Sequence, residues 1–128
     1  MTEEKRIYVV IPATVQVGLT EPRTTIVQPH GRQIAQACHV VSKLRWRNPP
    51  NPHKHEFEPI TTIILQARDS KELAHVLRLA MDRPLEWAVF NDENLLAYGP
   101  YFPMTALAVL ANPADIANVL DYLPLWGS

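Results

Sequence analysis

Four runs of β-forming, mostly apolar residues alternate with segments of helical spacing, and this alternation constrains the fold more than any other feature. The runs are Arg6–Val15, with Pro12 ending its pairing or lying at an edge, Ile60–Ala67, Glu86–Asp92 and Thr105–Ala111. Continuous apolar runs are typical of strands that are buried on both faces. The segments between them have apolar residues on one side, which indicates helices that cover a sheet. The sequence therefore predicts a layered α/β domain with a mixed four-stranded sheet covered by helices, in the order β-α-β-α-β-β-α.

The longest helical pattern covers residues 31–44, with Gly31 expected to supply the turn that enters the helix. We expect one side to pack against the sheet, namely Ile34, Ala37, Cys38, Val41 and Leu44. The opposite side is a polar stripe of Arg32, Gln36, His39 and Lys43. The ordinary interpretation of such a stripe is a solvated outer face. Because exposed faces usually mix both charges, a stripe with cations and no acid also indicates an anionic partner.

Two further helices are indicated closer to the C-terminus. The first is expected to start at a cap formed by Asp69 or Ser70, and to bury Leu73, Val76, Leu77 and Ala80. The second should start at Asn112, because Pro113 and an acid follow in its first turn, and should bury Ile116, Val119, Leu120 and Leu123. Residues 16–30 contain a glycine and two prolines, so we expect a loop there, with a short edge strand at 24–27 as the alternative.

Length and charge restrict the class of protein. A chain of 128 residues is typical of one domain, so we expect residues 1–128 to form a single unit. The net charge of −1 hides a division, since residues 1–54 have eight Lys or Arg against three acids, whereas residues 55–128 have four against ten. No acid occurs from Pro22 to His55. Such a cationic region steers polyanions even on a nearly neutral molecule.

Cysteine and histidine usage points to a metal-free cytoplasmic protein. The single cysteine, Cys38, excludes a disulfide within the chain and is typical of a reducing compartment. Its place on the apolar side predicts a buried, unreactive thiol. His53 and His55 have the spacing of a metal pair, but no third ligand lies nearby, so we expect a solvated basic loop and no cofactor. No apolar run reaches the roughly 18 residues of a membrane helix, and the polar N-terminal residues do not resemble a signal peptide.

The segment Gly31-Arg32-Gln33-Ile34-Ala35-Gln36-Ala37-Cys38-His39 resembles, without a gap, the glycine, lysine, alanine-rich, glutamine and histidine helix of type II peptidyl-tRNA hydrolases. Asp92, after a run of β-formers, is similar to the aspartate that ends the family's third strand. Residues 105–113 resemble the family's last strand and the proline that opens its last helix. The resemblance implies cleavage of the ester between a peptide and the 3′ end of tRNA, by a homodimer, without a required metal.

Residue by residue, the resemblance puts Arg32 in the place of the family's lysine, while Gln36, His39 and Asp92 match in type. These four are the expected catalytic residues. In ester cleavage, His39 or Asp92 would take a proton from water, and Arg32 or Gln36 would donate to the oxyanion. Arginine does not act as a base at ordinary pH. The family's Asp-Ala-Gly-x-Thr sequence is replaced by the residues at 92–96, which contain no threonine, and a proline-rich loop replaces the helix that follows the motif.

Three functions remain open from the sequence. The first is peptidyl-tRNA or related ester hydrolysis, with the tRNA phosphates held by His30, Lys43, Arg45 and Arg47. The second is a non-catalytic relative that binds RNA or another anionic ligand on the face of Arg32, His39 and Lys43. The third is a protein-interaction or dimer module, with aromatic anchors drawn from Trp87, Tyr98, Tyr101, Phe102 and Trp126.

Overall fold

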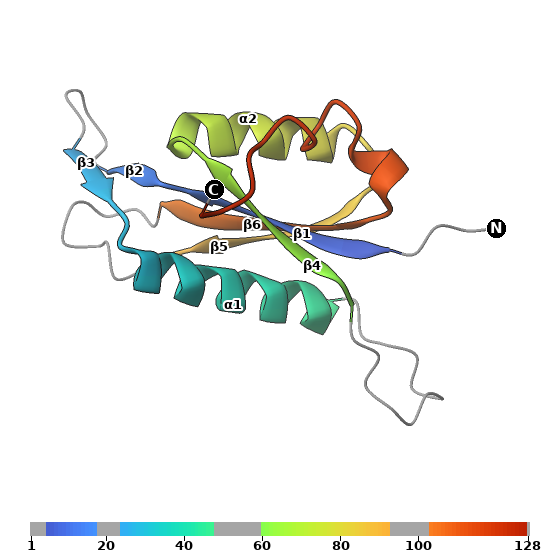
Figure 1. Cartoon of the computed structure of the whole chain (residues 1–128), viewed down its shortest axis with the longest axis horizontal. Helices are drawn as coiled ribbons and strands as arrows, with labels where there is room; N and C mark the ends of the chain where they lie inside the picture. Colours follow the sequence, from blue (N-terminus) through green and yellow to red (C-terminus); the bar gives the residue numbers. More distant parts are fainter. Residues whose placement is uncertain (1–4, 18–23, 48–59, 93–102, 128) are drawn as a thin grey trace.

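A four-stranded mixed sheet with one helix on each face forms the body of the protein, as the computed structural model shows (Figure 1). The structure describes residues 5–17, 24–47, 60–92 and 103–127. The elements are β1 (Arg6–Pro12), β2 (Thr14–Val17), β3 (Thr24–Val27), α1 (His30–Arg47), β4 (Thr62–Ala67), α2 (Ser70–Met81), β5 (Glu86–Asn91), β6 (Met104–Ala111) and the 3₁₀ helix η2 (Pro113–Ile116). The expected fold class, an α/β domain with a mixed four-stranded sheet, is confirmed.

The strand β1 lies in the middle of the sheet, whose order is β4-β1-β6-β5. It pairs in parallel with β4 and antiparallel with β6, and β5 pairs antiparallel with β6. Because side chains alternate across a strand, Ile7 and Val9 pack with α1 on one face, whereas Tyr8 and Val10 pack with α2 on the other. The unbroken apolar pattern of β1 is therefore the consequence of two separate hydrophobic cores.

Beyond Pro12 the chain leaves the main sheet, so the expected run Arg6–Val15 is divided between β1 and β2. Of the two alternatives for residues 16–30, the short strand at 24–27 is correct, because β3 lies there. β2 and β3 pair antiparallel in a small second sheet. Val15 and Val17 of β2 are buried, with Ile26 of β3 packed against them. The β-branched residues of both strands favour this pairing.

The expected helix after Asn112 is also corrected, although its start is as predicted. Asn112 forms a reciprocal capping box with Asp115, in which each side chain accepts a hydrogen bond from the other's backbone N–H. However, the helix is only the short η2, and turns follow it. Asn118 adopts a left-handed backbone conformation with φ of 64°, which a continuing α-helix does not allow. The apolar residues expected here are nevertheless buried: Ile116, Val119, Leu120 and Leu123.

Helix α1 is rotated relative to the orientation that its apolar pattern predicts. Its buried residues are Gln33, Gln36, Ala37, Val40 and Leu44. Ile34 is 51% exposed, and the thiol-bearing Cys38 is exposed as well, so the expectation of a buried cysteine is wrong. The helix begins at His30, which places Gly31 inside it and not in an entering turn. Two glutamines face inward because each finds hydrogen-bond partners there.

Helix α2 follows its sequence pattern closely. Asp69 is its N-cap, with the side chain accepting a hydrogen bond from the N–H of Glu72 at 2.9 Å. Leu73, Val76 and Ala80 are buried as expected. Within the residues that the structure describes, no helix is long and apolar enough to cross a membrane.

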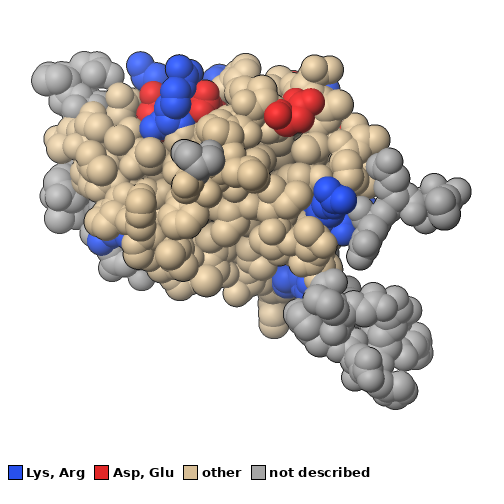
Figure 2. Space-filling view, in the orientation of Figure 1, with Lys and Arg blue, Asp and Glu red and all other residues tan. Residues whose placement is uncertain are grey.

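Charged side chains are distributed unevenly over the surface. On the face in Figure 2, basic and acidic side chains lie together over the start of α2, where Arg68 pairs with Glu72 at 3.1 Å. Elsewhere on this face the basic groups are separate from one another. This view therefore shows no continuous basic surface.

Candidate functional site

Asp92 is a buried carboxylate at the end of an edge strand. It directly follows β5, and its side chain is only 3% exposed. The pairing of β5 with β6 shifts register between Phe90 and Asn91, and the backbone N–H of Asp92 donates to the Pro103 carbonyl oxygen at 3.1 Å. Irregularities of this kind re-aim side chains at strand ends. Such a carboxylate is costly to bury without hydrogen-bond donors.

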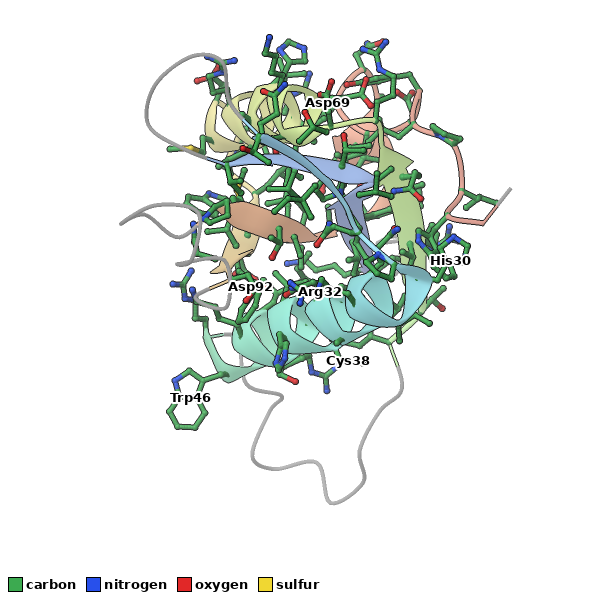
Figure 3. All side chains as sticks on the ribbon, turned by 90° about the vertical axis from the view of Figure 1, so that its left-hand side faces the viewer. His30, Arg32, Cys38, Trp46, Asp69 and Asp92 are labelled. Atoms are coloured by element: carbon green, nitrogen blue, oxygen red, sulfur yellow. The ribbon has the colours of Figure 1, made fainter. Side chains whose placement is uncertain are left out.

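Two side chains of α1 supply those donors. Gln36 Nε2 donates to Asp92 Oδ2 at 2.6 Å, and Arg32 Nη1 lies 3.3 Å from the same oxygen. Figure 3 shows Arg32 and Asp92 facing each other between α1 and the sheet. The Gln36 side chain is buried, whereas that of Arg32 is 39% exposed. The amide of Gln36 is therefore the inner partner, and the guanidinium of Arg32 lies between the carboxylate and solvent.

A pocket of about 230 Å³ opens beside these three side chains. It is lined by Arg32, Ala35, Gln36, His39, Phe90 and Asp92. Gln36 Oε1 is buried and has no hydrogen-bond partner among the described residues. Buried polar atoms of native proteins are nearly always paired, with protein or with an ordered molecule. The site therefore combines a buried carboxylate and an arginine beside the pocket, with a buried amide oxygen of Gln36 behind them.

His39 forms a flat wall of this pocket. Its ring stacks on Phe90 with centroids 4.7 Å apart and an interplanar angle of 16°. The residue is exposed. Its ring nitrogens make no hydrogen bond to any described residue, including Asp92. His39 is thus beside the carboxylate without being linked to it.

Two further cations of α1, Lys43 and Arg47, lie along the outer edge of β5. Lys43 Nζ donates to the Val89 carbonyl oxygen at 2.8 Å, and Arg47 Nη1 lies 3.5 Å from the Trp87 carbonyl oxygen. An edge strand leaves such carbonyls without a neighbouring strand. Lys43 and Arg47 therefore stabilise the edge of the sheet, and their other N–H groups remain for a ligand.

The expected phosphate-binding residues do not form one cluster. His30 is at the opposite end of α1 from Arg47, roughly 25 Å away along the helix axis. It is exposed and contacts Trp126 edge to face, with ring centroids 5.4 Å apart. Figure 3 shows His30 well separated from Asp92. Arg45 is half-buried.

A second polar network lies at the start of α1. Gln33 Nε2 donates to the Gln28 carbonyl oxygen at 2.7 Å, and Gln33 Oε1 accepts from Trp126 Nε1 at 2.8 Å. Gln66 Nε2 donates to the Ile11 carbonyl oxygen at 2.7 Å and lies 3.3 Å from Gln33 Oε1. These glutamines join the helix to the ends of β1 and β4 and hold the C-terminal segment, which explains why Gln33 is buried.

Some sequence expectations concern other parts of the chain. In the described parts of the chain, no group of three or more His, Cys, Asp or Glu is arranged to hold a metal ion. The loop with His53 and His55 lies outside the described residues, as do Tyr98, Tyr101 and Phe102. Trp87 and Trp126 are both half-buried.

Phe90 and Ala35 line the pocket, although neither was among the expected site residues. A signal for Phe90 exists, since side chains two apart on a strand point to the same face. Phe90 precedes Asp92 by two positions, and both line the pocket. Nothing in the sequence indicated Ala35 as a pocket residue, because its small side chain contributes only space to the pocket.

Comparison with known proteins supports the fold without adding a function. No protein-family model matches the chain, and no curated protein matches it. Among solved structures, it is similar to a protein of unknown function from Agrobacterium tumefaciens, with a TM-score of 0.61 and 9% sequence identity. The match covers 97% of this chain and 98% of that one. At this identity the likeness shows a shared α/β fold alone.

Proposed function

We propose that this protein hydrolyses an ester of the peptidyl-tRNA type, with Arg32, Gln36 and Asp92 as its catalytic residues. The observation that supports this most is the buried Asp92 carboxylate, held by Gln36 at 2.6 Å and by Arg32 at 3.3 Å beside an open pocket. Arg32 is also at the position of the lysine in the hydrolase motif, and Gln36 and Asp92 match residues of that family in type. A buried acid with a fixed orientation in a pocket is typical of a catalytic site.

Each of the three side chains has a defined part in the proposed reaction. Gln36 Nε2 holds the Asp92 carboxylate in place, and Asp92 takes a proton from a water molecule in the pocket as the water oxygen attacks the ester carbonyl. Arg32 donates to the oxyanion of the tetrahedral intermediate. The bond between the carbonyl carbon and the ribose 3′ oxygen then breaks, and the proton passes from Asp92 to the leaving 3′ oxygen. The products are a tRNA with a 3′ hydroxyl and a free peptide carboxylic acid, which releases its proton to solvent.

His39 is not given the proton in this scheme. A general base needs hydrogen-bond reach to the water, and its orientation is normally fixed by a further hydrogen bond. The ring of His39 is held by stacking on Phe90 instead.

The proposed partner is tRNA, bound through its phosphates by the cations of α1, Lys43, Arg45 and Arg47, together with His30. Lys43 uses one of its three N–H donors on β5, and His30 is exposed. Homodimer formation and a cytoplasmic location complete the proposal, the latter supported by an exposed free cysteine.

The test is release of the amino acid from a tRNA that carries an N-acetylated aminoacyl group. Asp92→Asn and Arg32→Ala should each lower kcat/KM by roughly 100-fold or more, the range seen when a base or an oxyanion donor is removed. Arg32→Lys should retain activity, since the family that the motif resembles has lysine there. Arg78→Ala, at an exposed position of α2, is the matched control and should behave as the wild type. Circular dichroism must show that each variant is folded.

Absence of release by the wild type, even at stoichiometric enzyme, would refute the proposal. The alternative function, binding of RNA or another anionic ligand without turnover, is favoured by the arginine at position 32, because guanidinium holds phosphate with paired N–H groups. It predicts tRNA binding that weakens steeply with salt, and loss of binding in Arg32→Ala.

A further inference from the structure

The stacked pair of His39 and Phe90 gives the pocket one planar wall. Phe90 belongs to β5, and its backbone position is fixed because β5 is paired with β6. His39 lies almost parallel to it, at an interplanar angle of 16°. One face of the imidazole is thus occupied by Phe90, while the residue as a whole remains exposed. The other face of the ring is directed away from Phe90.

His39 differs in this from the other members of the polar stripe. Lys43 donates to a β5 carbonyl, and Arg32 and Gln36 bind the Asp92 carboxylate. Only the ring of His39 makes its contact through a face and not through a polar atom, within the part of the chain that the structure describes. A ring that is already held flat loses little conformational freedom when another ring stacks on it.

The position of His39 along α1 relates this ring to the reacting groups. It follows Gln36 by three residues, which is roughly 4.5 Å along the helix axis and less than one turn. Both side chains line the same pocket, together with Asp92. A planar group stacked on His39 would therefore lie at the mouth of the pocket that Asp92 also lines.

We propose that His39 is the stacking residue for the nucleobase of the nucleoside that carries the ester, so that the base lies on the imidazole and the sugar points toward Asp92. This inference rests on the proposed function and specifies how its substrate is recognised. Every base has a π-face, so stacking of this kind selects a nucleoside over a simple alcohol without selecting its sequence. Phe90 is the support that keeps the imidazole in plane.

Binding of adenosine 5′-monophosphate, followed by NMR on the ring protons of His39 and Phe90, tests the inference without any hydrolysis. Ribose 5-phosphate, which has the sugar and the phosphate but no base, is the control ligand. We expect the monophosphate to shift both rings and ribose 5-phosphate to leave them unchanged. Equal shifts from the two ligands, or none from about 10 mM monophosphate, where a millimolar site would be mostly filled, would overturn it.

Variants separate stacking from proton transfer. His39→Phe keeps a planar ring and removes both ring nitrogens, so it should bind the monophosphate within about three-fold of the wild type. His39→Ala should weaken binding by about ten-fold or more, the usual effect of losing one stacking ring. His75→Ala, which removes an exposed histidine of α2, is the matched control and should have no effect. Equal weakening in His39→Phe and His39→Ala would show that a ring nitrogen is required and would refute stacking.

The outcome is distinguishable from failure of the hydrolase proposal. If the monophosphate binds as described but no peptidyl-tRNA is cleaved, the stacking residue stands and the hydrolase does not. If cleavage occurs, His39→Ala should raise KM by about ten-fold with kcat nearly unchanged, and His39→Phe should restore KM. Loss of kcat in His39→Phe would assign His39 to proton transfer and refute the stacking role.

Discussion

The buried contact between Gln36 and Asp92 should contribute more to stability than the ion pair between Arg32 and Asp92. In Asp92→Ala, the amide of Gln36 would lose its acceptor, and its Oε1 already has no partner among the described residues, so a buried polar side chain would lose its pairing to that part of the chain. Leaving one buried donor unpaired costs about 1–3 kcal/mol. Arg32 would instead turn to water, because its side chain is 39% exposed, and pairs of this kind contribute under about 1 kcal/mol.

Two double-mutant cycles measured by urea denaturation compare these contacts directly. Gln36→Met and Arg32→Met each keep an aliphatic stem and remove the polar end, so they are matched probes. Combined with Asp92→Ala, Gln36→Met should show a coupling of about 1–3 kcal/mol, and Arg32→Met one of under about 1 kcal/mol. Arg78→Met, at an exposed site of α2, should show none beyond about 0.5 kcal/mol. A larger coupling for Arg32 than for Gln36 would refute the reasoning from burial.

Three further predictions address other parts of the molecule. The thiol of Cys38 should react with Ellman's reagent in the native protein as fast as in the unfolded one, because it is exposed; protection until denaturation would contradict this. Trp126→Phe should lower the free energy of unfolding by about 0.5–1.5 kcal/mol, since the ring remains but the N–H donor to Gln33 is lost; an unchanged urea midpoint would show that this bond is immaterial. Burial, with a further contribution from the Glu72 carboxylate, raises the pKa of Tyr122 above its ordinary value of 10.0. The stability that the neutral phenol contributes should be complete below pH 10.0 and should fall as the pH rises through the raised pKa. Alkaline denaturation should show this loss in the wild type and not in Tyr122→Phe.

The sheet was predictable because its buried strands are runs of apolar, β-forming residues. β1 is apolar at successive positions, and in the structure successive side chains enter different cores. Caps were predictable for a similar reason, since Asp69 and Asn112 bond locally to backbone N–H groups a few residues away. Both kinds of signal depend on neighbours in sequence.

The orientation of α1 was not predictable in the same way. A pattern of apolar residues treats glutamine as a surface residue, but Gln33 and Gln36 are buried because partners distant in sequence satisfy them. Those partners are Trp126 for Gln33 and Asp92 for Gln36. Ile34 and Cys38 turn outward as a result.

The candidate site shows the same division. The motif in α1 and the acid after a strand indicated which residue types to consider, and the structure brings Arg32, Gln36 and Asp92 into contact. It places His39 beside them but stacked on Phe90, and it leaves His30 at the far end of the helix. The orientation of the helix on the sheet decides which cations lie at the site. The periodicity of apolar residues did not predict that orientation.

The central place of β1 has a consequence for synthesis of the protein. Its two neighbours come from much later in the chain, as the pairing of Ile7 with Thr62 and of Arg6 with Ala111 shows. While the ribosome is still making the middle of the chain, the first strand has no complete sheet to join, and its apolar side chains must wait in contact with water or a chaperone. We therefore expect the nascent chain to be most prone to aggregation until β6 has left the exit tunnel. Slower translation of the last codons would prolong the time for which the apolar side chains of β1 are exposed.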